Sequence, residues 1–379
     1  MALVLNEEQR MIKDSAREFL TANAPVSALR KLRDESDPVG YSQALWQQMV
    51  ELGWTAIAIP ENYGGHGFGF QGLGLIFEEA GHTLAATPLF SSIVLGASVI
   101  ELCGTESQRQ QLLPEVASGE LTLALALEEG NHHAPCRINT RAEKSANGYR
   151  LQGSKTFVLD GHTAGKLLVV ARTSGNSNDC SGISIFLVDS KAAGVEITRT
   201  IMMDSRNAAN ITLNNVEVDS SALLGSEGAA YPALDSVLDR GRILIAAEML
   251  GGCLEAFNRT MAYLKEREQF GVKIGSFQAL KHRAAIMFVE LELCKSVVLE
   301  ALTAIDSGSE ELSSLASIAK AKLNDTYQLV TNEATQMHGG IGVTDELDIG
   351  LFLKRARVSI QTLGDSAFHR DRFATLSGY

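Results

Sequence analysis

The spacing of apolar residues along this 379-residue chain changes twice, and this constrains the fold more than any other feature. Up to about residue 120, apolar side chains recur every three or four residues, as they do on one face of a helix. From Leu121 they alternate within short β-branched segments, and from Pro232 the helical period returns. The sequence therefore predicts three domains, in residues 1–120, 121–230 and 231–379.

The first domain is expected to be helical. Asn6 and Gln9 have the spacing of a capping box, which starts a helix. Residues 60–65 interrupt the pattern, because proline and paired glycines do not continue a helix. Separate helices are expected at 43–52, 73–84, 91–102 and 106–117.

The middle domain is expected to be a compact β-domain, with strands at 121–127, 149–159, 166–172, 183–188, 195–200 and 211–218. Turn residues separate these strands without an intervening helix, so a closed antiparallel barrel or a sandwich is favoured over a βαβ layout. The last domain is expected to be a four-helix bundle, with helices at 232–267, 277–305, 311–337 and 347–361. The fold class is therefore α+β.

Charge and apolar runs exclude two classes of partner. The formal net charge of −12 disfavours nucleic acid, because phosphate binding needs a basic face. No run of 18 apolar residues predicts a membrane span, and the N-terminus lacks the pattern of a signal peptide. We expect a cytoplasmic protein.

The five cysteines are scattered and include no CxxC pair. An odd count without paired spacing predicts neither a disulfide framework nor a zinc ribbon. We expect reduced thiols with structural roles.

Two local patterns resemble ligand sites. Gly67, Gly69 and Gly72 spell GxGxxG, but no strand is expected before them, so a plain glycine-rich loop is favoured over a dinucleotide fingerprint. A second segment crowds Glu128, Glu129, His132, His133 and Cys136. It lacks metal-ligand spacing, so we predict no metal site and favour a polar loop at a ligand mouth.

Two helix ends carry groups suited to phosphate. Arg267, followed by Gln269 and Phe270, lies at a turn between helices, where a guanidinium can grip a pyrophosphate. Capping of the helix end by Arg267 is the alternative. Gly339 and Gly340 end a later helix and let a backbone or phosphate approach closely, although an ordinary C-cap would also use glycine.

Short motifs follow one another in a familiar order at 52–53, 60–67, 77–81, 108–110, 113–114, 153–157, 242–251, 267–271, 277–278 and 336–342. Together they resemble the acyl-CoA dehydrogenase family over essentially the whole chain. Residues 363–372 look like bacterial members that act on steroid side chains, some of which are heteromeric pairs. The resemblance implies an acyl-CoA substrate, FAD between the β-domain and the bundle, a tetramer or dimer, and an electron-transferring flavoprotein as acceptor.

The resemblance also implies roles for individual residues. Arg267, Gln269, Phe270 and Gln278 would hold the pyrophosphate and adenosine of a neighbour's FAD, with Gln336 and Gly340 on the other side. Phe157 would cover the flavin face, and Arg242 would face the CoA-binding region. Leu127, His133 and Leu159 stand where the family presents hydroxyls to the flavin.

The family removes the α-proton with a glutamate while the flavin takes a β-hydride, and the backbone N–H of that glutamate stabilises the enolate oxygen. This sequence has Leu363 and Gly241 at the two usual glutamate positions. Asp365 is the candidate base, because it would point the same way as Leu363 in an extended segment. Its alternative role is to cap a helix beginning at Ser366. Asp239, about 200° around its helix from Gly241, is the weaker candidate.

These patterns leave four hypotheses open. The chain is an active dehydrogenase whose base is Asp365 or another residue, or a base-lacking subunit of a heteromeric dehydrogenase. Alternatively it performs a different flavin-dependent reaction on an acyl-CoA, or it is a ligand-binding relic of the fold.

Overall fold

The computed structural model describes residues 4–379, and the packing of the chain divides it into two units. The helical unit contains the segments up to Glu35, Phe70–Ala85 and Arg242–Tyr379. The sheet unit contains Ser36–Gly69 and Ala86–Gly241. The fold class is α+β, as predicted, with helices at both ends of the chain and a sheet-rich middle.

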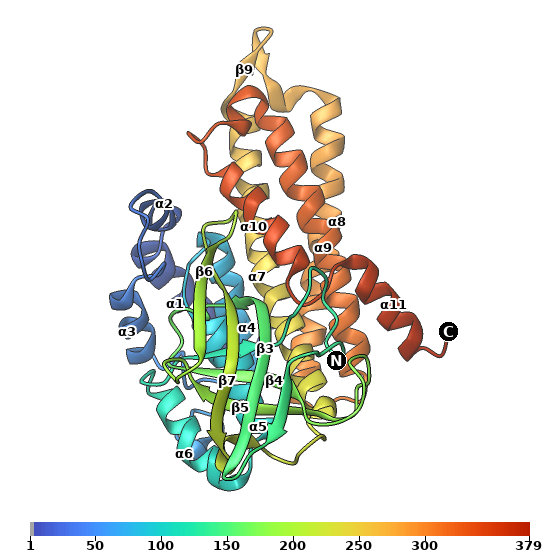
Figure 1. Ribbon diagram of the computed structural model, residues 1–379. Helices are drawn as coiled ribbons and strands as arrows, with labels where there is room; N and C mark the ends of the chain where they lie inside the picture. Colours follow the sequence, from blue (N-terminus) through green and yellow to red (C-terminus); the bar gives the residue numbers. More distant parts are fainter. Residues whose placement is uncertain (1–3) are drawn as a thin grey trace. The chain divides into compact units, whose positions relative to one another are not determined.

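Long helices build most of the helical unit. They are α1 (Glu7–Asn23), α2 (Val26–Asp34), α4 (Phe70–Thr83), α8 (Gln278–Asp306), α9 (Leu312–His338), α10 (Ile349–Gln361), α11 (Ser366–Leu376) and the part of α7 (Tyr231–Glu266) that follows Gly241. Figure 1 shows α8, α9 and α10 packed side by side in the bundle. A small hairpin of β9 (Glu268–Gln269) and β10 (Val272–Lys273) follows α7. Short 3-10 turns complete the unit at η4 (Ile274–Ser276) and η5 (Gly339–Val343).

Two glycines let helices α4 and α7 cross in backbone contact. A Cβ atom built on Gly81 would lie 2.0 Å from the carbonyl oxygen of Glu248, and one on Gly251 would lie 1.8 Å from that of Glu78. Any larger residue at either position would force the helices apart, because protein interiors are close-packed. The crossing therefore depends on glycine at both positions.

The sheet unit combines short helices with one sheet. Its helices are α3 (Gln43–Glu51), α5 (Ser98–Cys103), α6 (Glu106–Ala117), the π-helix η2 (Leu89–Ala97), the 3-10 turns η1 (Glu61–Tyr63) and η3 (Ser220–Ala222), and the start of α7. Its strands are β1 (Leu123–Ala126), β2 (Arg141–Lys144), β3 (Gly148–Leu159), β4 (Lys166–Arg172), β5 (Ile183–Asp189), β6 (Val195–Ile201), β7 (Asn207–Asp219) and β8 (Leu223–Leu224).

The sheet is an open path and no barrel closes, so the barrel alternative of the sequence analysis is wrong. Its strand order is β6-β7-β3-β2-β4-β5-β8, and β1 pairs with β4. The β1–β4 pair is parallel, whereas most other pairs are antiparallel. Strand alternation reports which face is buried and not which strand lies alongside, so pairing could not be inferred. Apolar side chains of β3, β4, β5 and β7, including Leu151, Leu167, Phe186 and Ile211, form the core of the sheet.

The cysteine prediction is also corrected. Cys136 and Cys180 form a disulfide, with Cα atoms 4.7 Å apart, whereas Cys103, Cys253 and Cys294 are free and buried. The two partners are 44 residues apart, so only the folded loops of the sheet unit bring them together.

The glycine-rich loop is confirmed as a plain loop. No strand precedes Gly67 among the described residues, and Gly72 already lies within α4. Across residues 4–379, we find no helix whose length and apolar character would suffice for crossing a bilayer.

Candidate functional site

The α10–α11 turn, residues 362–365, contains Leu363, which the sequence analysis predicted to occupy one of the two usual glutamate positions. Leu363 has a φ of +57° and Gly364 a φ of +109°, so the chain reverses in the left-handed region of backbone space. A non-glycine residue there costs roughly 1–2 kcal/mol. Leu363 is 8% exposed. The turn is a buried, strained segment, and the surrounding helices must hold it.

Three side chains from two helices hold the turn by its carbonyl oxygens. Lys320 of α9 donates to Gly364 O at 3.0 Å, and Asn324, one helical turn later, donates to the same oxygen at 3.3 Å. Nε2 of His369 on α11 lies 3.0 Å from Leu363 O. Because a carbonyl oxygen only accepts, the ring nitrogen is the donor. Both carbonyls after Thr362 are thus fixed by side chains that are almost fully buried.

One polar group of the turn lacks a partner. Thr362 N–H donates to Val358 O at 3.1 Å, and Gly364 N–H approaches Gln361 O at 3.4 Å, whereas Leu363 N–H donates to no acceptor within residues 4–379. An unpaired N–H in a buried segment costs about 1–3 kcal/mol, so it indicates an acceptor from outside the chain. A single fixed N–H suits an oxygen on which negative charge develops.

The two candidate bases, Asp365 and Asp239, lie in different elements. The Asp365 carboxylate accepts the Phe368 N–H at 2.9 Å and is the N-cap of α11, so the capping alternative is confirmed. Its role as a base stays a prediction. Gly241 and Asp239 are both buried on α7, and the Asp239 carboxylate is engaged in an interaction of its own.

Arg242 lies in α7 and is fully buried. Its guanidinium carbon is 5.6 Å from the centre of the Phe368 ring, which belongs to the first turn of α11. A cation over an aromatic face is stabilised by the ring quadrupole. Arg242 is therefore held beside the helix that follows the α10–α11 turn, and its role toward CoA stays a prediction.

In the sheet unit, the β1–β2 loop, residues 127–140, is held by a buried ion pair. Lys155 Nζ donates to Glu129 Oε1 at 2.7 Å and to Leu127 O at 3.1 Å. Glu129 also accepts the N–H groups of Asn139 and Thr140, at 2.6 and 2.9 Å. Burial lowers the pKa of Lys155 to about 8, although Glu129 opposes the shift. Burial acts to raise the pKa of Glu129, but Lys155 and Thr140 hold it below its usual value.

The far end of the β1–β2 loop is held covalently and by an arginine. The buried Arg172 donates to Ile138 O at 3.0 Å, to Cys136 O at 3.1 Å and to Asp179 O at 2.7 Å. Cys136 and Cys180 add their disulfide between the same two loops. The loop that follows β1 is therefore anchored at both ends.

The loop residues that suggested a ligand mouth are paired with one another. His133 Nδ1 lies 2.5 Å from Glu128 Oε1, and both side chains are largely buried. Leu127 is buried as well, and Leu159 is half-buried at the end of β3. Cys136 is bonded to Cys180, so its sulfur is not available as a metal ligand. That this segment holds no metal site stays a prediction.

Phe157 occupies an irregular place in β3. The register between β3 and β7 shifts between Lys155 and Val158, and Phe157 there has a φ of +52°. Such a bulge redirects a side chain, and bulges are frequent next to functional sites. The aromatic position predicted to cover a flavin is thus specified by backbone irregularity as well as by residue type.

The residues predicted to hold the pyrophosphate and adenosine of FAD lie between the end of α7 and the start of α8, most of them in or beside the β9–β10 hairpin. Arg267, Gln269, Phe270 and Gln278 are all exposed, and Phe270 is 92% exposed with a φ of +56°. Within residues 4–379, the Arg267 guanidinium has no carboxylate partner. A dinucleotide needs donors for its phosphates and apolar surface for its base. The unpaired guanidinium of Arg267 and the exposed ring of Phe270 supply these, so these residues fit FAD.

Gln336 lies in the last turn of α9 and Gly340 in η5, which follows it, and a contact joins this region to the end of α7. Tyr263, near the end of α7, donates its hydroxyl to His338 O at 3.3 Å, and the two rings stack with centres 4.4 Å apart. A Cβ atom on Gly340 would meet nothing within 4 Å. The helix ends are thus joined, and Gly340 faces open space that a ligand or partner can occupy.

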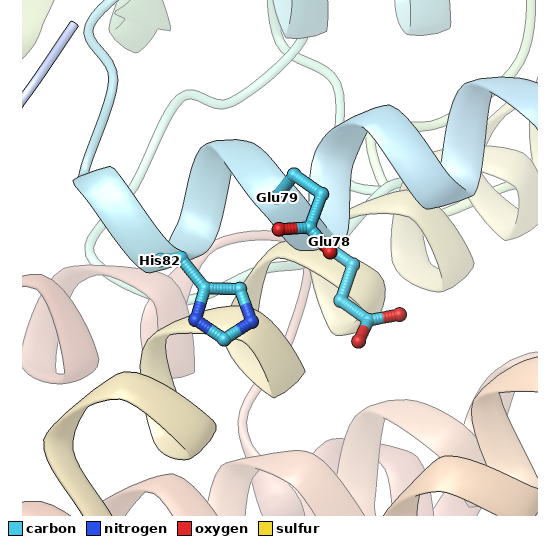
Figure 2. A group of neighbouring side chains, drawn as sticks. All are labelled: Glu78, Glu79 and His82. Atoms are coloured by element: carbon cyan, nitrogen blue, oxygen red, sulfur yellow. The ribbon is translucent and has the colours of Figure 1, made fainter. Parts of the chain in front are cut away.

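A group with metal-ligand character lies elsewhere in the helical unit and was not predicted. Figure 2 shows Glu78, Glu79 and His82 on α4, with ligand atoms within 4.8 Å of one another. Lys13 donates to Glu78 at 2.7 Å, and Arg17 bonds both oxygens of Glu79 at 2.9 and 3.2 Å. These cations already neutralise the carboxylates and would repel a metal ion.

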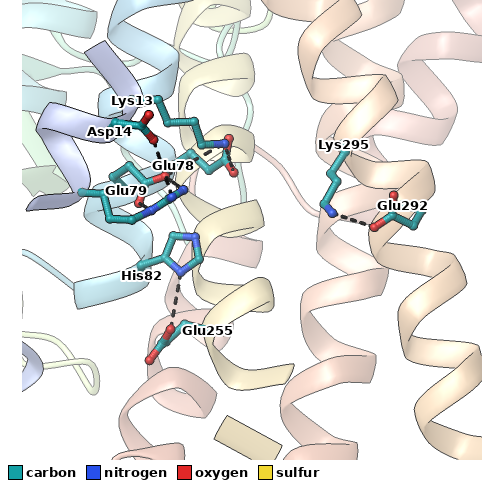
Figure 3. Close-up of polar contacts among 9 residues, drawn as sticks. Lys13, Asp14, Glu78, Glu79, His82, Glu255, Glu292 and Lys295 are labelled. Carbon is teal, nitrogen blue, oxygen red and sulfur yellow. Dashed lines mark hydrogen bonds and ion pairs between the residues drawn. The ribbon is translucent and has the colours of Figure 1, made fainter. Parts of the chain in front are cut away.

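The same residues line a charged cavity of about 680 Å³ between α1, α4, α7 and α8. Figure 3 shows that His82 contacts Glu255 and that Lys295 pairs with Glu292, at 3.5 and 2.6 Å. Glu255 also pairs with Arg259 at 2.7 Å. Nearly every charged side chain around the cavity has a partner. We therefore interpret these side chains as an ion-pair network that joins the helices.

Sequence reasoning missed the side chains that hold the two loops. Lys320 stands at a position where the period of α9 places core residues, between Ala316 and Leu323, and it is 0% exposed. A charged residue on the apolar face of a predicted helix was the available signal. Lys155 gave no such signal, because strand alternation alone does not separate it from surface lysines.

Known protein families match three consecutive stretches of the chain. The models for the acyl-CoA dehydrogenase N-terminal, middle and C-terminal domains match residues 6–120, 126–216 and 231–376. The probable acyl-CoA dehydrogenase YngJ of Bacillus subtilis (strain 168) is 30% identical over 377 residues, which cover 98% of each chain.

Two solved structures are similar over the same length. One, from work on the electron transferring flavoprotein of Acidaminococcus fermentans, is 30% identical, with a TM-score of 0.91 and full coverage of both chains. The other, a variant of the Tcur3481-Tcur3483 steroid ACAD, is 32% identical, with a TM-score of 0.87 and 98% coverage of each chain.

Proposed function

Because the chain belongs to the acyl-CoA dehydrogenase family of oxidoreductases, we propose that it takes part in the FAD-dependent α,β-dehydrogenation of an acyl-CoA thioester. The observation that carries this proposal is the unpaired N–H of Leu363 in the buried α10–α11 turn. Loss of the α-proton places negative charge on the thioester oxygen, and a fixed N–H stabilises that charge. The donor is main chain, so leucine at this position keeps it.

The cofactor of the proposed reaction is FAD. When bound, it supplies the acceptor for the β-hydride. We assign its pyrophosphate and adenosine to Arg267, Gln269, Phe270 and Gln278 of a neighbouring subunit, with Gln336 and Gly340 opposite and Phe157 against the ring system. The unpaired Arg267 and the open space at Gly340 support this assignment.

The test is the visible spectrum of the purified chain, alone and after addition of a panel of saturated acyl-CoA thioesters. Bound flavin that is bleached by an acyl-CoA supports the proposal. Flavin that no acyl-CoA reduces, whether the chain is alone or co-expressed with a homologous chain, contradicts it. Arg242→Met serves as the probe for CoA binding, with a raised KM expected because the substrate loses a cation.

Asp365 is the candidate base in an enzyme of this chain alone. Asp365→Asn keeps a good N-cap acceptor for the Phe368 N–H and removes the base. We expect kcat to fall by roughly 10²–10⁴-fold if Asp365 takes the α-proton, with no change in stability. Unchanged turnover would assign the proton to another group.

A second candidate is a heteromeric enzyme in which a related chain supplies the base. The observation that favours it is the capping role of Asp365, together with non-acidic residues at positions 363 and 241. The similar steroid ACAD carries a two-part name, Tcur3481-Tcur3483. An apolar strip on α8 is exposed and suits a partner subunit, formed by Ile286, Val289 and Leu293 at 57, 55 and 50% exposure. Flavin and activity that appear only on co-expression with a homologous chain would establish this arrangement.

Several finer assignments accompany the proposal. The acyl group is of the steroid side-chain type, the electron acceptor is an electron-transferring flavoprotein, and the assembly is a tetramer or dimer in the cytoplasm. The domains are bounded at residues 120 and 230. Limited proteolysis that cuts near both boundaries supports them, whereas stable fragments with other ends contradict them.

A different flavin-dependent reaction on an acyl-CoA would be recognised by products that lack an α,β double bond.

A further inference from the structure

Lys320 has an unusual environment for a lysine. Its side chain is 0% exposed, and its Nζ atom lies close to four oxygens, those of Asn324 (2.7 Å), Ser359 (2.9 Å), Gly364 (3.0 Å) and Ile360 (3.2 Å). None of these oxygens carries a full charge. Within residues 4–379, Lys320 forms no ion pair. Burial and the nearby guanidinium of Arg242 lower the pKa of Lys320 well below its usual value.

Stability alone does not explain a lysine at this position. An ammonium buried with no carboxylate at hydrogen-bond distance loses its hydration, and the more distant Asp365 carboxylate and the partial charges on carbonyls only partly compensate for that loss. An apolar residue would suit the apolar neighbours of α9, such as Ala316 and Leu323, at lower cost. A lysine that is kept in place although burial acts against its charged form points to a function that depends on it.

Lys320 joins two parts of the backbone through its hydrogen bonds. Ser359 O and Ile360 O belong to the last turn of α10, and Gly364 O lies beyond the reversal at Leu363. A cation at the end of a helix also interacts favourably with the helix dipole. The same side chain therefore fixes the chain before and after Leu363.

His369 completes this arrangement from α11. Its Nε2 atom donates to Leu363 O at 3.0 Å, and the ring is fully buried. Each carbonyl from Leu363 to Gly364 is thereby occupied by a side chain, and the N–H of Leu363 is left without an intramolecular acceptor among the described residues. Rotation of these peptides would have to break two or more buried hydrogen bonds.

We propose that Lys320 and His369 are positioning residues that hold the strained α10–α11 turn in the one conformation that presents the Leu363 N–H to the oxyanion of the reacting thioester. This inference rests on the proposed function. Neither side chain contacts the substrate in this role, because both act through the backbone of the turn.

The experiment measures binding to the FAD-loaded full chain, with its partner chain if one is needed. The probe is a 3-ketoacyl-CoA, whose enolate carries the same oxyanion without turnover, and the reference ligand is a saturated S-alkyl-CoA thioether, which has no thioester carbonyl. Lys320→Met and His369→Leu are each expected to weaken enolate binding by roughly 10–100-fold, because a misplaced donor loses most of its effect. Binding of the thioether is expected to change less than about threefold, since it forms no oxyanion.

Two further variants separate positioning from a general loss of structure. His369→Gln retains a side-chain donor for Leu363 O and is expected to restore enolate binding to within about threefold of the unaltered chain. Lys322→Met removes a lysine of the same helix that pairs with Glu290 near the surface, and it should change neither ligand's affinity. Equal losses for both ligands, or no rescue by His369→Gln, would overturn the inference.

Binding by the unaltered chain tests the proposed function, and the comparison with the variants tests the positioning role. If the unaltered chain holds FAD but binds neither thioester nor thioether, the proposed function fails. If it binds the enolate tightly and Lys320→Met and His369→Leu bind it equally well, only the positioning role fails. Should Lys320→Met not fold, the His369→Leu and His369→Gln pair decides the question.

Discussion

Two loops of this protein, one in each unit, are held by a fully buried lysine, but the two lysines have different hydrogen-bond partners. In the β1–β2 loop, Lys155 faces the carboxylate of Glu129 at 2.7 Å, with further anchors from Arg172 and a disulfide. In the α10–α11 turn, Lys320 hydrogen-bonds only to neutral oxygens, and the Asp365 carboxylate acts on it from farther away. The first loop has redundant anchors, whereas the second depends on very few side chains. The difference shows that a buried lysine can stabilise a loop by charge pairing or define its geometry by hydrogen bonding.

The largest effect is expected from Glu129→Gln. This change leaves the Lys155 ammonium buried without its carboxylate, and breaking such a pair costs about 3–5 kcal/mol of unfolding free energy. Urea denaturation at pH 7 measures it. The double variant Glu129→Gln/Lys155→Met removes both charges and should recover part of the loss. A single-variant cost below about 1 kcal/mol would mean that the loop does not depend on the ion pair.

The next effect concerns the disulfide. Reduction of Cys136–Cys180 is expected to lower the unfolding free energy by about 2–4 kcal/mol, because the cross-link closes a loop of 44 residues. Urea denaturation with and without dithiothreitol measures the change, and the Cys136→Ser/Cys180→Ser variant should be insensitive to reductant. Five titratable thiols in the unreduced, unfolded chain, in place of three, would show that the bond does not form.

A smaller effect is expected from pH. The pKa of Lys155 is about 8 in the folded protein and 10.5 when exposed. Between these values the unfolded chain binds the extra proton, so the unfolding free energy contributed by Lys155 rises with pH, by on the order of 2 kcal/mol. The measurement is the difference between the unaltered chain and Lys155→Met from pH 7.5 to 10. A flat difference would place the pKa of this lysine near its usual value.

The smallest effect is expected at the α10–α11 turn from Asp365→Ala. Loss of the N-cap of α11 costs about 1 kcal/mol, because the Phe368 N–H loses its acceptor. Thermal unfolding measures it, with Asp365→Asn as the control that keeps a cap. A loss above about 3 kcal/mol would show that Asp365 supports the turn beyond capping.

Local patterns predicted the elements well. Helix α6 (Glu106–Ala117) and strand β4 (Lys166–Arg172) have the predicted bounds, and the capping box of Asn6 and Gln9 is present. These features depend on neighbours in sequence. One helix expected at 91–102 is instead the π-helix η2 followed by α5, because its all-buried surface gives no periodic contrast that would reveal the break.

Features that depend on distant parts of the chain were not predictable in this way. The parallel pairing of β1 with β4 and the Cys136–Cys180 bond join segments that only the complete sheet unit brings together. At the site, residue types at positions 363, 241 and 365 could be read directly. The unpaired N–H of Leu363 could not, because it depends on the conformation of the turn, which contacts residues such as Lys320 and His369 only in the folded chain.

The N-terminus of α4 has a consequence for the order in which the chain is made. The N–H groups of Phe70 and Gln71 are capped by the Asp306 carboxylate at the end of α8, at 2.7 and 2.9 Å, and the latter pair is 235 residues apart in sequence. At ribosomal rates of roughly 5–20 residues per second, Asp306 emerges roughly 12 to 47 s after Gln71. Until Glu248 of α7 is made, the apolar surface of α4 lacks both its cap and the helix that it packs against at Gly81, and afterwards it still lacks its cap. The nascent chain therefore has a long period of vulnerability, in which a chaperone or slow growth would matter more for yield than the stability of the finished protein.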